Sequence, residues 1–411
     1  MNLYLFNDND SAAIYGIGTY LKELTHALED NAINIHIVHL RSARPKFEIE
    51  KTNRIENWYI PEAHNHNTFA GSIQKVEDYY LNVIYLLRLY IKDTKDLIFH
   101  FNYNQSQALA KGLKEVFDCK AVVTVHYVKW MLELHGNLFR LHTIQSKQEN
   151  QKTSFEQLLY TTDEYERALF REIDQVIALS QNMRDTLEAE YQIDPNKISV
   201  IPNGIEDMCS ALVTDKDSLR RKWRIPDREC IILFVGRLHS VKGLLFLIKA
   251  FRELLEKIPD CRLMIAGSGN YDIYLQEAKD TGTKITFTGL LGKQELYELY
   301  RLADLGLMPS FHEQCSYVAI EMMMHDLPII GSTTTGLKEM IIDGETGLHI
   351  PVIAYDDRVE IDTSLLAEKM FYLLQQSDER KHMGVNARKR YESLYTAEGM
   401  GQQMIALYKS L

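Results

Sequence analysis

Residues 303–346 read ADLGLMPSFHEQCSYVAIEMMMHDLPIIGSTTTGLKEMIIDGET, and this stretch decides the fold. It contains an apolar run at Leu305–Met308, a helical pattern at about Tyr317–Met324, and a second apolar run at Leu327–Ile330. Neither apolar run alternates with polar residues, which is typical of parallel strands covered by helices on both faces. The stretch therefore predicts a strand, a short helix and a parallel strand.

Two carboxylates and a helix start fall where such a unit binds ligands. Ligands of parallel sheets lie where strands end and helices begin. Glu313 is in the loop before the helix, and Glu321 is one turn inside it, on the face that carries Tyr317. The amides of Ser316 and Tyr317 have no partner within the helix, so we expect them to face a phosphate. The carboxylates suit sugar and ribose hydroxyls, which donate hydrogen bonds.

Length and charge narrow the class of protein. A chain of 411 residues predicts two domains of roughly 200 residues each. A hydrophobic content of 45% and a charged content of 25% are ordinary for a globular protein. The net charge of −11 argues against a general nucleic-acid binder, because such a surface must offset phosphate charge.

The cysteines and the apolar segments indicate a cytoplasmic protein. Five cysteines without a C-x-x-C spacing predict neither a disulfide framework nor a zinc site, and they fit a reducing compartment. The amino terminus lacks the basic start and apolar stretch of a signal peptide. The run Leu81–Tyr90 is too short to span a bilayer, and we expect a buried helix there.

The amino-terminal half begins with a strand, a glycine loop and a helix. We expect a strand at Asn2–Phe6 and a helix from about Gly18 to Leu28, with Gly16 and Gly18 letting amides approach a ligand. A dinucleotide fingerprint is one alternative, but its third glycine is replaced by Leu21 and no ribose-binding acid ends the next strand. The other alternative is that this glycine loop is a turn that only connects the strand to the helix.

His126 ends a buried strand expected at Ala121–Val125, so it should lie at the carboxyl edge of the sheet. Both a structural role and a ligand-binding role are open for this histidine. The following segment, Lys129–Tyr165, predicts a polar excursion containing helices. Strands at Ile177–Ser180 and Ile198–Ile201 close this half.

The second half restarts with a strand at Cys230–Val235 and a cationic loop. Gly236 and Arg237 follow the strand directly, and Lys242 precedes the next helix. Two cations at such an edge can hold a diphosphate, whereas alone they would be an ordinary pair of surface charges. Gly267 and Gly289 end two further expected strands and leave room for a nucleotide.

Two other patterns have alternative interpretations. Asp8 and Asp10 form a D-x-D that can be read as a metal clamp, but a helix cap or an acceptor contact is the preferred interpretation. Cys315 lies beside the predicted phosphate-binding amides. It has no adjacent base in the sequence, so it is a packing residue of the site and not a nucleophile.

These residues resemble the large family of retaining GT-B glycosyltransferases, glycosyl transferases group 1, which includes sucrose synthases, bacterial glycogen synthases and mannosyltransferases of cell-envelope assembly. The resemblance covers nearly the whole chain and rests on the following motifs: Val200-Ile-Pro-Asn-Gly-Ile205, Phe234-Val-Gly-Arg-Leu238 with Lys242-Gly243, Ala266-Gly-Ser-Gly269, Phe287-Thr-Gly289, Glu313 with Glu321, and Gly344-Glu-Thr-Gly347.

The resemblance implies a role for each matching residue. The residues matching Arg237 and Lys242 bind the donor diphosphate, the acid matching Glu313 holds the sugar, and the acid matching Glu321 holds the ribose. The histidine matching His126 touches the sugar from the other domain. The glycines matching Gly16 and Gly18 lie near the phosphates. The chain departs from the commoner pattern at Tyr15 and Tyr127, where a glycine and an aspartate are frequent, and both departures fall on the acceptor side.

The expected fold is α/β, with two Rossmann-like domains facing each other across a cleft. We place the first domain at 1–205, a hinge at 206–228, the nucleotide-sugar-binding domain at 229–385, and a terminal helix at 386–411 that crosses back to the first domain.

The expected reaction is retaining, metal-independent transfer of a sugar from a nucleoside diphosphate sugar, UDP or GDP. The acceptor would be a hydroxyl on a glycan, a lipid-linked saccharide or a peptide, as in polysaccharide biosynthesis. No cofactor, metal or nucleic acid is expected, and a peripheral membrane contact stays open. An epimerase acting on nucleotide sugars and a silent binding module are the alternatives.

Overall fold

The computed structural model describes residues 1–8, 16–29, 31–52, 54–62, 72–93, 95–102, 107–209 and 215–411, with the backbone alone at 72–76. The chain forms two compact units. Unit 1 comprises residues 1–129, 144–202 and 397–411, and unit 2 comprises residues 130–143 and 203–396. The grouping of 130–143 with the second half was not indicated by the sequence.

Unit 1 is built on an eight-stranded sheet in the order β3-β4-β2-β1-β5-β6-β7-β8. Only β3 runs antiparallel to its neighbour. The strands are β1 (Asn2–Asn7), β2 (Asn34–Ser42), β3 (Glu48–Thr52), β4 (Ile55–Pro61), β5 (Leu97–Phe101), β6 (Cys119–Val125), β7 (Gln175–Ala178) and β8 (Ile198–Val200). The helices are α1 (Gly16–Leu28), α2 (Ser72–Tyr90), α3 (Gln107–Val116), α6 (Ser154–Glu172), α7 (Gln181–Ala189) and α16 (Ala397–Ser410).

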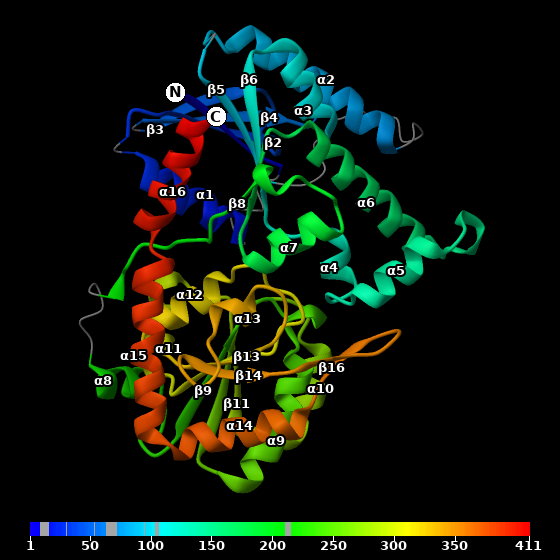
Figure 1. Ribbon diagram of the computed structural model, residues 1–411. Helices are drawn as coiled ribbons and strands as arrows, with labels where there is room; N and C mark the ends of the chain where they lie inside the picture. The colour runs from blue at the N-terminus through cyan, green and yellow to red at the C-terminus, as the bar shows by residue number, and fades with distance from the viewer. Residues whose placement is uncertain are drawn as a thin grey trace. The chain divides into compact units, whose positions relative to one another are not determined.

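The carboxyl-terminal helix α16 belongs to unit 1 and packs on α1, where the red and blue helices lie side by side in Figure 1. A Cβ at Gly401 of α16 would lie 2.7 Å from that of Ala27 in α1, so a glycine permits this close approach. The hydroxyl of Tyr408 on α16 also forms a hydrogen bond with the buried His100 of β5.

Unit 2 contains a six-stranded, wholly parallel sheet in the order β11-β10-β9-β12-β13-β14, and a separate hairpin. The strands are β9 (Cys230–Val235), β10 (Cys261–Ala266), β11 (Ile285–Gly289), β12 (Leu305–Met308), β13 (Ile329–Ser332), β14 (Gly347–Ile350), β15 (Val352–Ala354) and β16 (Val359–Ile361). The helices are α8 (Lys216–Lys222), α9 (Leu244–Lys257), α10 (Asp272–Ala278), α11 (Lys293–Leu302), α12 (Tyr317–Met324), α13 (Leu337–Met340), α14 (Thr363–Gln375) and α15 (Ser377–Leu394). Two further helices, α4 (Lys129–Glu133) and α5 (Leu138–Ser146), carry the 130–143 segment.

Both faces of the unit 2 sheet are buried, as the uninterrupted apolar strands predicted. Alternate residues of β9, such as Ile232 and Phe234, join the core under α9 and α14. On the other face, Met322 of α12 covers Gly306, because a Cβ there would lie 2.5 Å from the methionine sulfur. Helices therefore cover the central strands β9 and β12 on both sides.

Helix α2 corrects one expectation about the apolar run Leu81–Tyr90. The run is helical, but Leu81 and Tyr85 are 64% and 66% exposed, whereas Val83 and Leu87 of the same helix are buried. Apolar residues occupy both faces of α2, and only one face contacts the core. The prediction of a wholly buried helix is therefore wrong.

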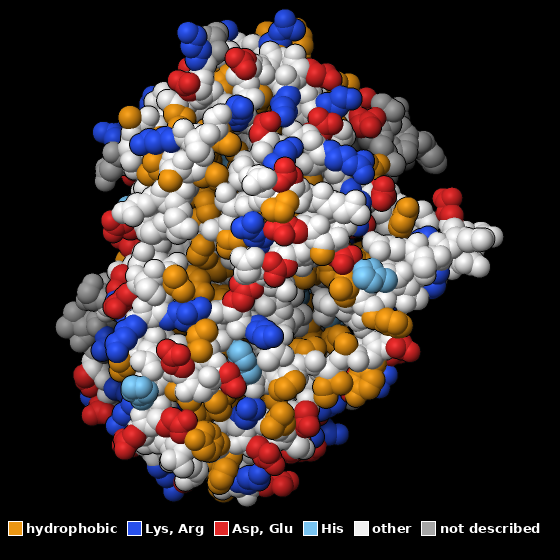
Figure 2. All heavy atoms as spheres, viewed as in Figure 1, with side chains coloured by type: hydrophobic (Ala, Val, Ile, Leu, Met, Phe, Trp, Pro, Cys, Tyr) orange, Lys and Arg blue, Asp and Glu red, His pale blue; other side chains and the backbone are white. Residues whose placement is uncertain are grey.

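No helix among the described residues is long and apolar enough to cross a bilayer. On the face seen in Figure 2, Lys and Arg side chains are interspersed with Asp and Glu side chains instead of forming one basic field.

Candidate functional site

The strand order of unit 2 reverses between β9 and β12. These two strands are neighbours in the sheet, although β10 and β11 lie between them in the chain. Open parallel sheets bind ligands at the point where the strand order reverses. The loop after β9 carries Arg237 and Lys242, and the loop after β12 carries Glu313. The topology therefore brings the cationic loop and the first acid to the same edge of the sheet.

Lys242 and Glu313 form an ion pair across this point. The Nζ atom of Lys242 lies 2.5 Å from Oε1 of Glu313, and the two side chains are only 18% and 11% exposed. The hydroxyl of Ser310 donates to the same oxygen at 3.0 Å. The sequence predicted separate partners for the two residues, a phosphate and a sugar. The structure brings them into contact, and an incoming diphosphate would compete with Glu313 for the lysine.

The cationic loop is held by the neighbouring strand end. The amide of Leu238 donates to the carbonyl of Ser268 at 2.8 Å, and that of Gly236 donates to Ala266 at 3.0 Å. Gly243 then adopts a left-handed φ of +67° and begins α9. Arg237 is exposed, whereas Lys242 is partly buried. The two cations therefore lie on one fixed loop but in different environments.

Hydroxyl groups that follow β13 hold the loop that carries Glu313. The amide of Glu313 donates to Thr335 Oγ1 at 3.0 Å, and the same hydroxyl donates to the Glu313 carbonyl. Thr334 donates to the carbonyl of Phe311 at 2.6 Å. The amide of Phe311 in turn donates to Val241 in the cationic loop at 2.7 Å. These threonines were missed from the sequence, although the Thr333–Thr335 run directly after a buried strand was a usable signal.

The start of α12 differs from the expectation for Ser316. Its amide donates to the sulfur of Met340 at 3.3 Å, so it already has a partner, although sulfur is a weak acceptor. The reason is tertiary, because α13 ends in Met340 beside the start of α12. The carbonyl of Cys315 accepts a hydrogen bond from Asn203 Nδ2 at 2.7 Å. Burial raises the pKa of the Cys315 thiol to about 12. Tyr317 is partly buried at the first position of the helix.

Glu321 is nearly buried on α12, with 9% of its surface exposed. The hydroxyl of Tyr300 on α11 donates to Glu321 Oε2 at 2.8 Å. Burial and the nearby carboxylate raise the pKa of Tyr300 well above its usual range, so the tyrosine stays a hydrogen-bond donor. Tyr300 was not found from the sequence, and it fixes the carboxylate that we assigned to the ribose.

Gly267 and Gly289 lie at the ends of β10 and β11, and they are hydrogen-bonded through the Gly267 amide and the Gly289 carbonyl at 2.9 Å. A Cβ at Gly267, whose φ is +151°, would lie 1.8 Å from the carbonyl oxygen of Gly236. The close approach of two strand ends therefore already requires a glycine at this position, in addition to any room it leaves for a ligand.

His126 follows β6 in unit 1, at the carboxyl edge that the sequence predicted. Its Nε2 atom lies 3.3 Å from Oδ1 of Asn102, and its ring meets the edge of Tyr20 at 4.8 Å between centroids. Burial lowers the pKa of His126 to about 3. The imidazole is therefore neutral near pH 7 and can offer a hydrogen bond but no charge.

Gly16 and Gly18 lie in the first turn of α1, where Gly16 is exposed and Gly18 is partly buried. Tyr15 and Asp10 fall outside the described residues. Asp8 is ion-paired with Arg41 of β2. Among the described residues, no group of three or more His, Cys, Asp or Glu is arranged to hold a metal ion.

A buried hydrogen-bond chain supports the strands next to His126. His100 bonds Tyr408 through Nδ1 and Thr124 through Nε2, both at 2.7 Å, and Thr124 meets the hydroxyl of Tyr20 at 3.0 Å. Burial lowers the pKa of His100 to about 3. These hydrogen bonds link α16 to β6, the strand that precedes His126.

We expect His100 to make unit 1 less stable in acid. Its folded pKa lies below the unfolded value of 6.5, so the unfolded chain binds the proton first and the stability present above pH 6.5 is lost as the pH falls toward 3. His100→Gln should therefore flatten the pH dependence of the unfolding free energy by up to about 1.4 kcal/mol per pH unit between pH 6 and 4. Urea unfolding at several pH values measures this slope. The exposed His26 provides the control, and equal slopes for His26→Gln and His100→Gln would contradict the assignment.

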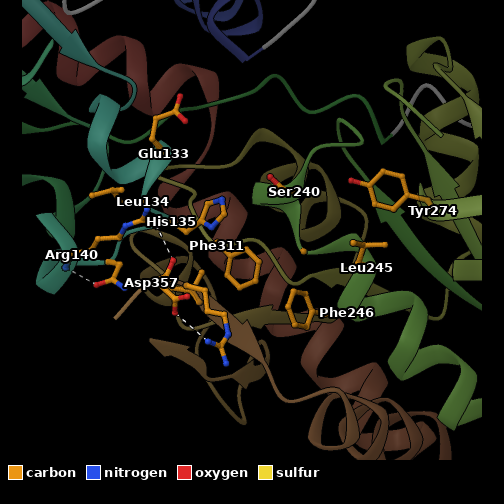
Figure 3. A pocket seen from close by; sticks show the side chains of 14 residues that line it. Glu133, Leu134, His135, Arg140, Ser240, Leu245, Phe246, Tyr274, Phe311 and Asp357 are labelled. Carbon is orange, nitrogen blue, oxygen red and sulfur yellow. Dashed lines mark hydrogen bonds and ion pairs between the residues drawn. The ribbon is translucent and has the colours of Figure 1, made fainter. Parts of the chain in front are cut away.

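A pocket of about 230 Å³ borders the cationic loop within unit 2 (Figure 3). The ring of His135 stacks on Phe311 with centroids 5.2 Å apart, and Phe246 meets Phe311 edge-on at 5.5 Å. Ser240 and Gly243 contribute the cationic-loop side. Ligand pockets usually measure about 300–1,000 Å³, so this space is too small for a whole nucleotide sugar.

The 130–143 segment also contributes residues to the lining of this pocket. Asn137 donates to the carbonyl of Tyr355 at 2.7 Å, and Arg140 donates to that of Asp357 at 2.9 Å. Both bonds reach the turn between β15 and β16. They account for the grouping of this segment with unit 2.

The chain was compared with known proteins. Residues 14–207 match the model of Glycosyltransferase Family 4, and residues 215–390 match that of Glycosyl transferases group 1. An alpha-D-kanosaminyltransferase from Streptomyces kanamyceticus is 26% identical over 251 residues, which are 60% of this chain and 63% of that protein. The alignment thus spans less than two thirds of this relative.

Two solved structures share the fold along the whole chain. Sucrose-phosphate synthase from Thermosynechococcus elongatus superposes with a TM-score of 0.77 at 22% identity, covering 100% of this chain and 98% of that one. Anabaena Alr3699/HepE, solved in complex with UDP and glucose, superposes with a TM-score of 0.72 at 14% identity and covers 100% of both chains. The two family matches together take in most of the sequence, and this chain belongs to the GT-B glycosyltransferases of the glycosyl transferases group 1 family.

Proposed function

We propose that this protein is a retaining, metal-independent glycosyltransferase that moves a sugar from a nucleoside diphosphate sugar to an acceptor hydroxyl. The observation that carries the proposal is the contact between Lys242 and Glu313 at the point where the strand order of unit 2 reverses. A cation there suits a diphosphate, and a carboxylate beside it suits the hydroxyls of the attached sugar. UDP or GDP is the proposed nucleotide, and HepE, which was solved with UDP-glucose, supports UDP.

In this proposal Arg237 and Lys242 stabilise the leaving group. Negative charge grows on the diphosphate as the glycosidic bond breaks, and fixed cations lower the barrier because they are already oriented. Lys242 would leave Glu313 for the phosphate, which frees the carboxylate to accept hydrogen bonds from the sugar. Glu321, held by Tyr300, would accept from the ribose hydroxyls, and the glycines at 236, 267 and 289 would border the nucleotide.

The remaining residues act on the sugar and the phosphates. Cys315, Ser316 and Tyr317 would lie against the donor at the start of α12, with the amide of Ser316 exchanging its weak sulfur partner for a phosphate oxygen. We assign His126 as a neutral hydrogen-bonding group for the sugar, and Gly16 and Gly18 to the phosphates. The departing phosphate would itself take the proton of the acceptor hydroxyl. The acceptor is a glycan, a lipid-linked saccharide or a peptide.

Release of nucleoside diphosphate from a panel of UDP and GDP sugars tests the proposal, with and without excess chelator. We expect release with one donor, enhanced by an acceptor saccharide and unchanged by the chelator. A thermal shift identifies the donor independently, since a ligand at about 100 times its Kd stabilises by about 2.7 kcal/mol. NMR of the product decides retention at the anomeric carbon.

Three results would contradict the proposal. Conversion of the donor to another nucleotide sugar without an acceptor would indicate an epimerase. Donor binding without turnover across the acceptor panel would indicate a binding module. Turnover that chelator abolishes and Mg²⁺ restores would support Asp8 and Asp10 as a metal clamp.

The two acids should affect different kinetic constants. Glu321→Ala should mainly raise KM for the donor, because ribose contacts change little during the reaction. Glu313→Gln should mainly lower kcat, because it holds the sugar whose geometry changes. Steady-state kinetics with a fixed acceptor measure both. Tyr300→Phe removes the hydroxyl that holds Glu321 but keeps the carboxylate, so it should raise KM less than Glu321→Ala does. The same change in both constants for both acids would contradict their separate roles.

A further inference from the structure

Two of the five cysteines are direct neighbours in the unit 2 sheet. Cys230 is the first residue of β9 and Cys261 is the first residue of β10, and the parallel register pairs them with each other. Residues paired in this way project from the same face of a sheet. Both side chains lie on the face covered by α9 and α14, where Cys261 is fully buried and Cys230 is partly buried against the same core.

The register places the two cysteines within reach of a disulfide. Neighbouring strands lie about 4.8 Å apart, and the Cα atoms of disulfide-linked cysteines are usually about 4.4–6.8 Å apart. Both thiols are free in this structure. Since each cysteine begins its strand, a small local shift can bring the sulfurs together without breaking the ladder beyond them.

The surroundings activate one thiol of the pair. A hydrogen bond from the thiol of Cys261 lowers the pKa of Cys230 below its ordinary value, and Arg380 and Arg220 act in the same direction against burial and Asp304. The same contact and burial raise the pKa of Cys261. Cys230 is also the more accessible of the two, since Cys261 is buried, so we expect Cys230 to be the nucleophile and Cys261 the second thiol.

The other three cysteines lie in less reactive surroundings. Burial raises the pKa of Cys119 to about 12, that of Cys209 to about 11 and that of Cys315 to about 12. Cys119 and Cys209 are partly exposed, as Cys230 is, so access alone does not distinguish Cys230 from them.

We propose that Cys230 and Cys261 form an oxidisable dithiol that hydrogen peroxide converts into a disulfide. The Cys230 thiolate attacks one peroxide oxygen, giving a sulfenic acid and hydroxide. The Cys261 thiol then attacks the sulfenic sulfur, forming the S–S bond and releasing water. In sum, two thiols and one peroxide give one disulfide and two waters, and a small thiol such as glutathione reverses the oxidation.

The disulfide would join the amino ends of β9 and β10, which is the sheet edge opposite Gly236 and Gly267. Six residues of strand span about 20 Å, so the cross-link does not touch the proposed donor site. It closes the chain around the cationic loop and α9. The expected consequence is a higher melting temperature of the oxidised protein, and this does not depend on the proposed function.

The experiment treats the full chain with hydrogen peroxide, blocks free thiols, digests without reductant and identifies the linked peptides by mass spectrometry. We expect a peptide joining Cys230 to Cys261, lighter by two hydrogens, and oxidation of Cys230 at least about tenfold faster than that of Cys209. Cys209→Ser should leave the cross-link unchanged. Cys261→Ser keeps a hydrogen-bond donor beside Cys230 but cannot form the disulfide, so in this variant the sulfenic acid of Cys230 should persist and react with dimedone.

Absence of the linked peptide from the peroxide-treated wild-type protein overturns the proposal. It is also overturned if Cys209 and Cys230 are oxidised at equal rates. The wild-type measurement needs no substitution, so a variant that fails to fold does not affect it.

Discussion

Replacing Lys242 with methionine is expected to lower kcat/KM for the donor by about ten- to a hundredfold. A charged hydrogen bond in a partly dry site contributes about 1.5–3 kcal/mol, and this amount converts to such a change in rate. The effect should fall mainly on kcat, because the leaving group gains charge in the transition state. Steady-state kinetics with the donor identified above measure it.

Lys249→Met provides the matched control, since it removes the same charge from an exposed position on α9, the helix that follows the cationic loop. Arg237→Lys extends the test. Lysine cannot present the planar fork that engages two phosphate oxygens, so it should restore little activity. The losses in Arg237→Ala and Lys242→Met should not add, because both cations act on one leaving group. Near wild-type kcat/KM in Lys242→Met would refute the phosphate assignment.

The stabilities of Lys242 and Glu313 variants distinguish the structural role of this ion pair from its role in catalysis. Lys242→Met leaves the carboxylate of Glu313 nearly buried without its cation, and removing one partner of a buried pair costs more than removing both. The double variant Lys242→Met with Glu313→Gln should therefore be more stable than Lys242→Met alone, yet no more active. Recovery of activity in the double variant would mean that the lysine acts only by neutralising Glu313.

Gly243→Ala is expected to destabilise unit 2 by about 3–4 kcal/mol or prevent its folding. Its φ of +67° is left-handed, and an added Cβ would lie 1.9 Å from the carbonyl oxygen of Pro309. Pro309 begins the loop that carries Glu313. The clash with its carbonyl would therefore push the cationic loop away from Glu313. Denaturant unfolding measures the loss, and kcat/KM of any folded fraction should fall with it.

Gly344→Ala is a control that measures the cost of a left-handed backbone without the steric clash expected in Gly243→Ala. Gly344 has a similar φ of +76°, and no atom lies within 4 Å of its added Cβ. Left-handed backbone alone costs an alanine about 1–2 kcal/mol. Equal losses in Gly243→Ala and Gly344→Ala would mean that the contact with Pro309 does not constrain the loop.

The sequence determined the central βα units of unit 2, although the strand expected at Leu327–Ile330 is observed at Ile329–Ser332 as β13. The strands at Leu305–Met308 and Cys230–Val235 and the helix at Tyr317–Met324 have the expected bounds. Uninterrupted apolar runs of this length are typical of parallel strands covered on both faces. Strands β3 and β4 were not foreseen. In β3 nearly every residue is exposed, so an edge strand of this kind leaves no hydrophobic pattern to find.

Tertiary structure alone decided which side chains meet. The approach of Lys242 to Glu313 depends on β9 lying beside β12, an order that no local pattern encodes. The same holds for Tyr300 on Glu321 and for Met340 on the amide of Ser316, since each contact joins separate helices. Cys230 and Cys261 show most clearly that the sequence alone does not reveal which side chains are in contact. Their spacing resembles no cysteine motif, and only the register of two parallel strands makes them neighbours, because side-chain contacts across a sheet follow strand pairing and not distance along the chain.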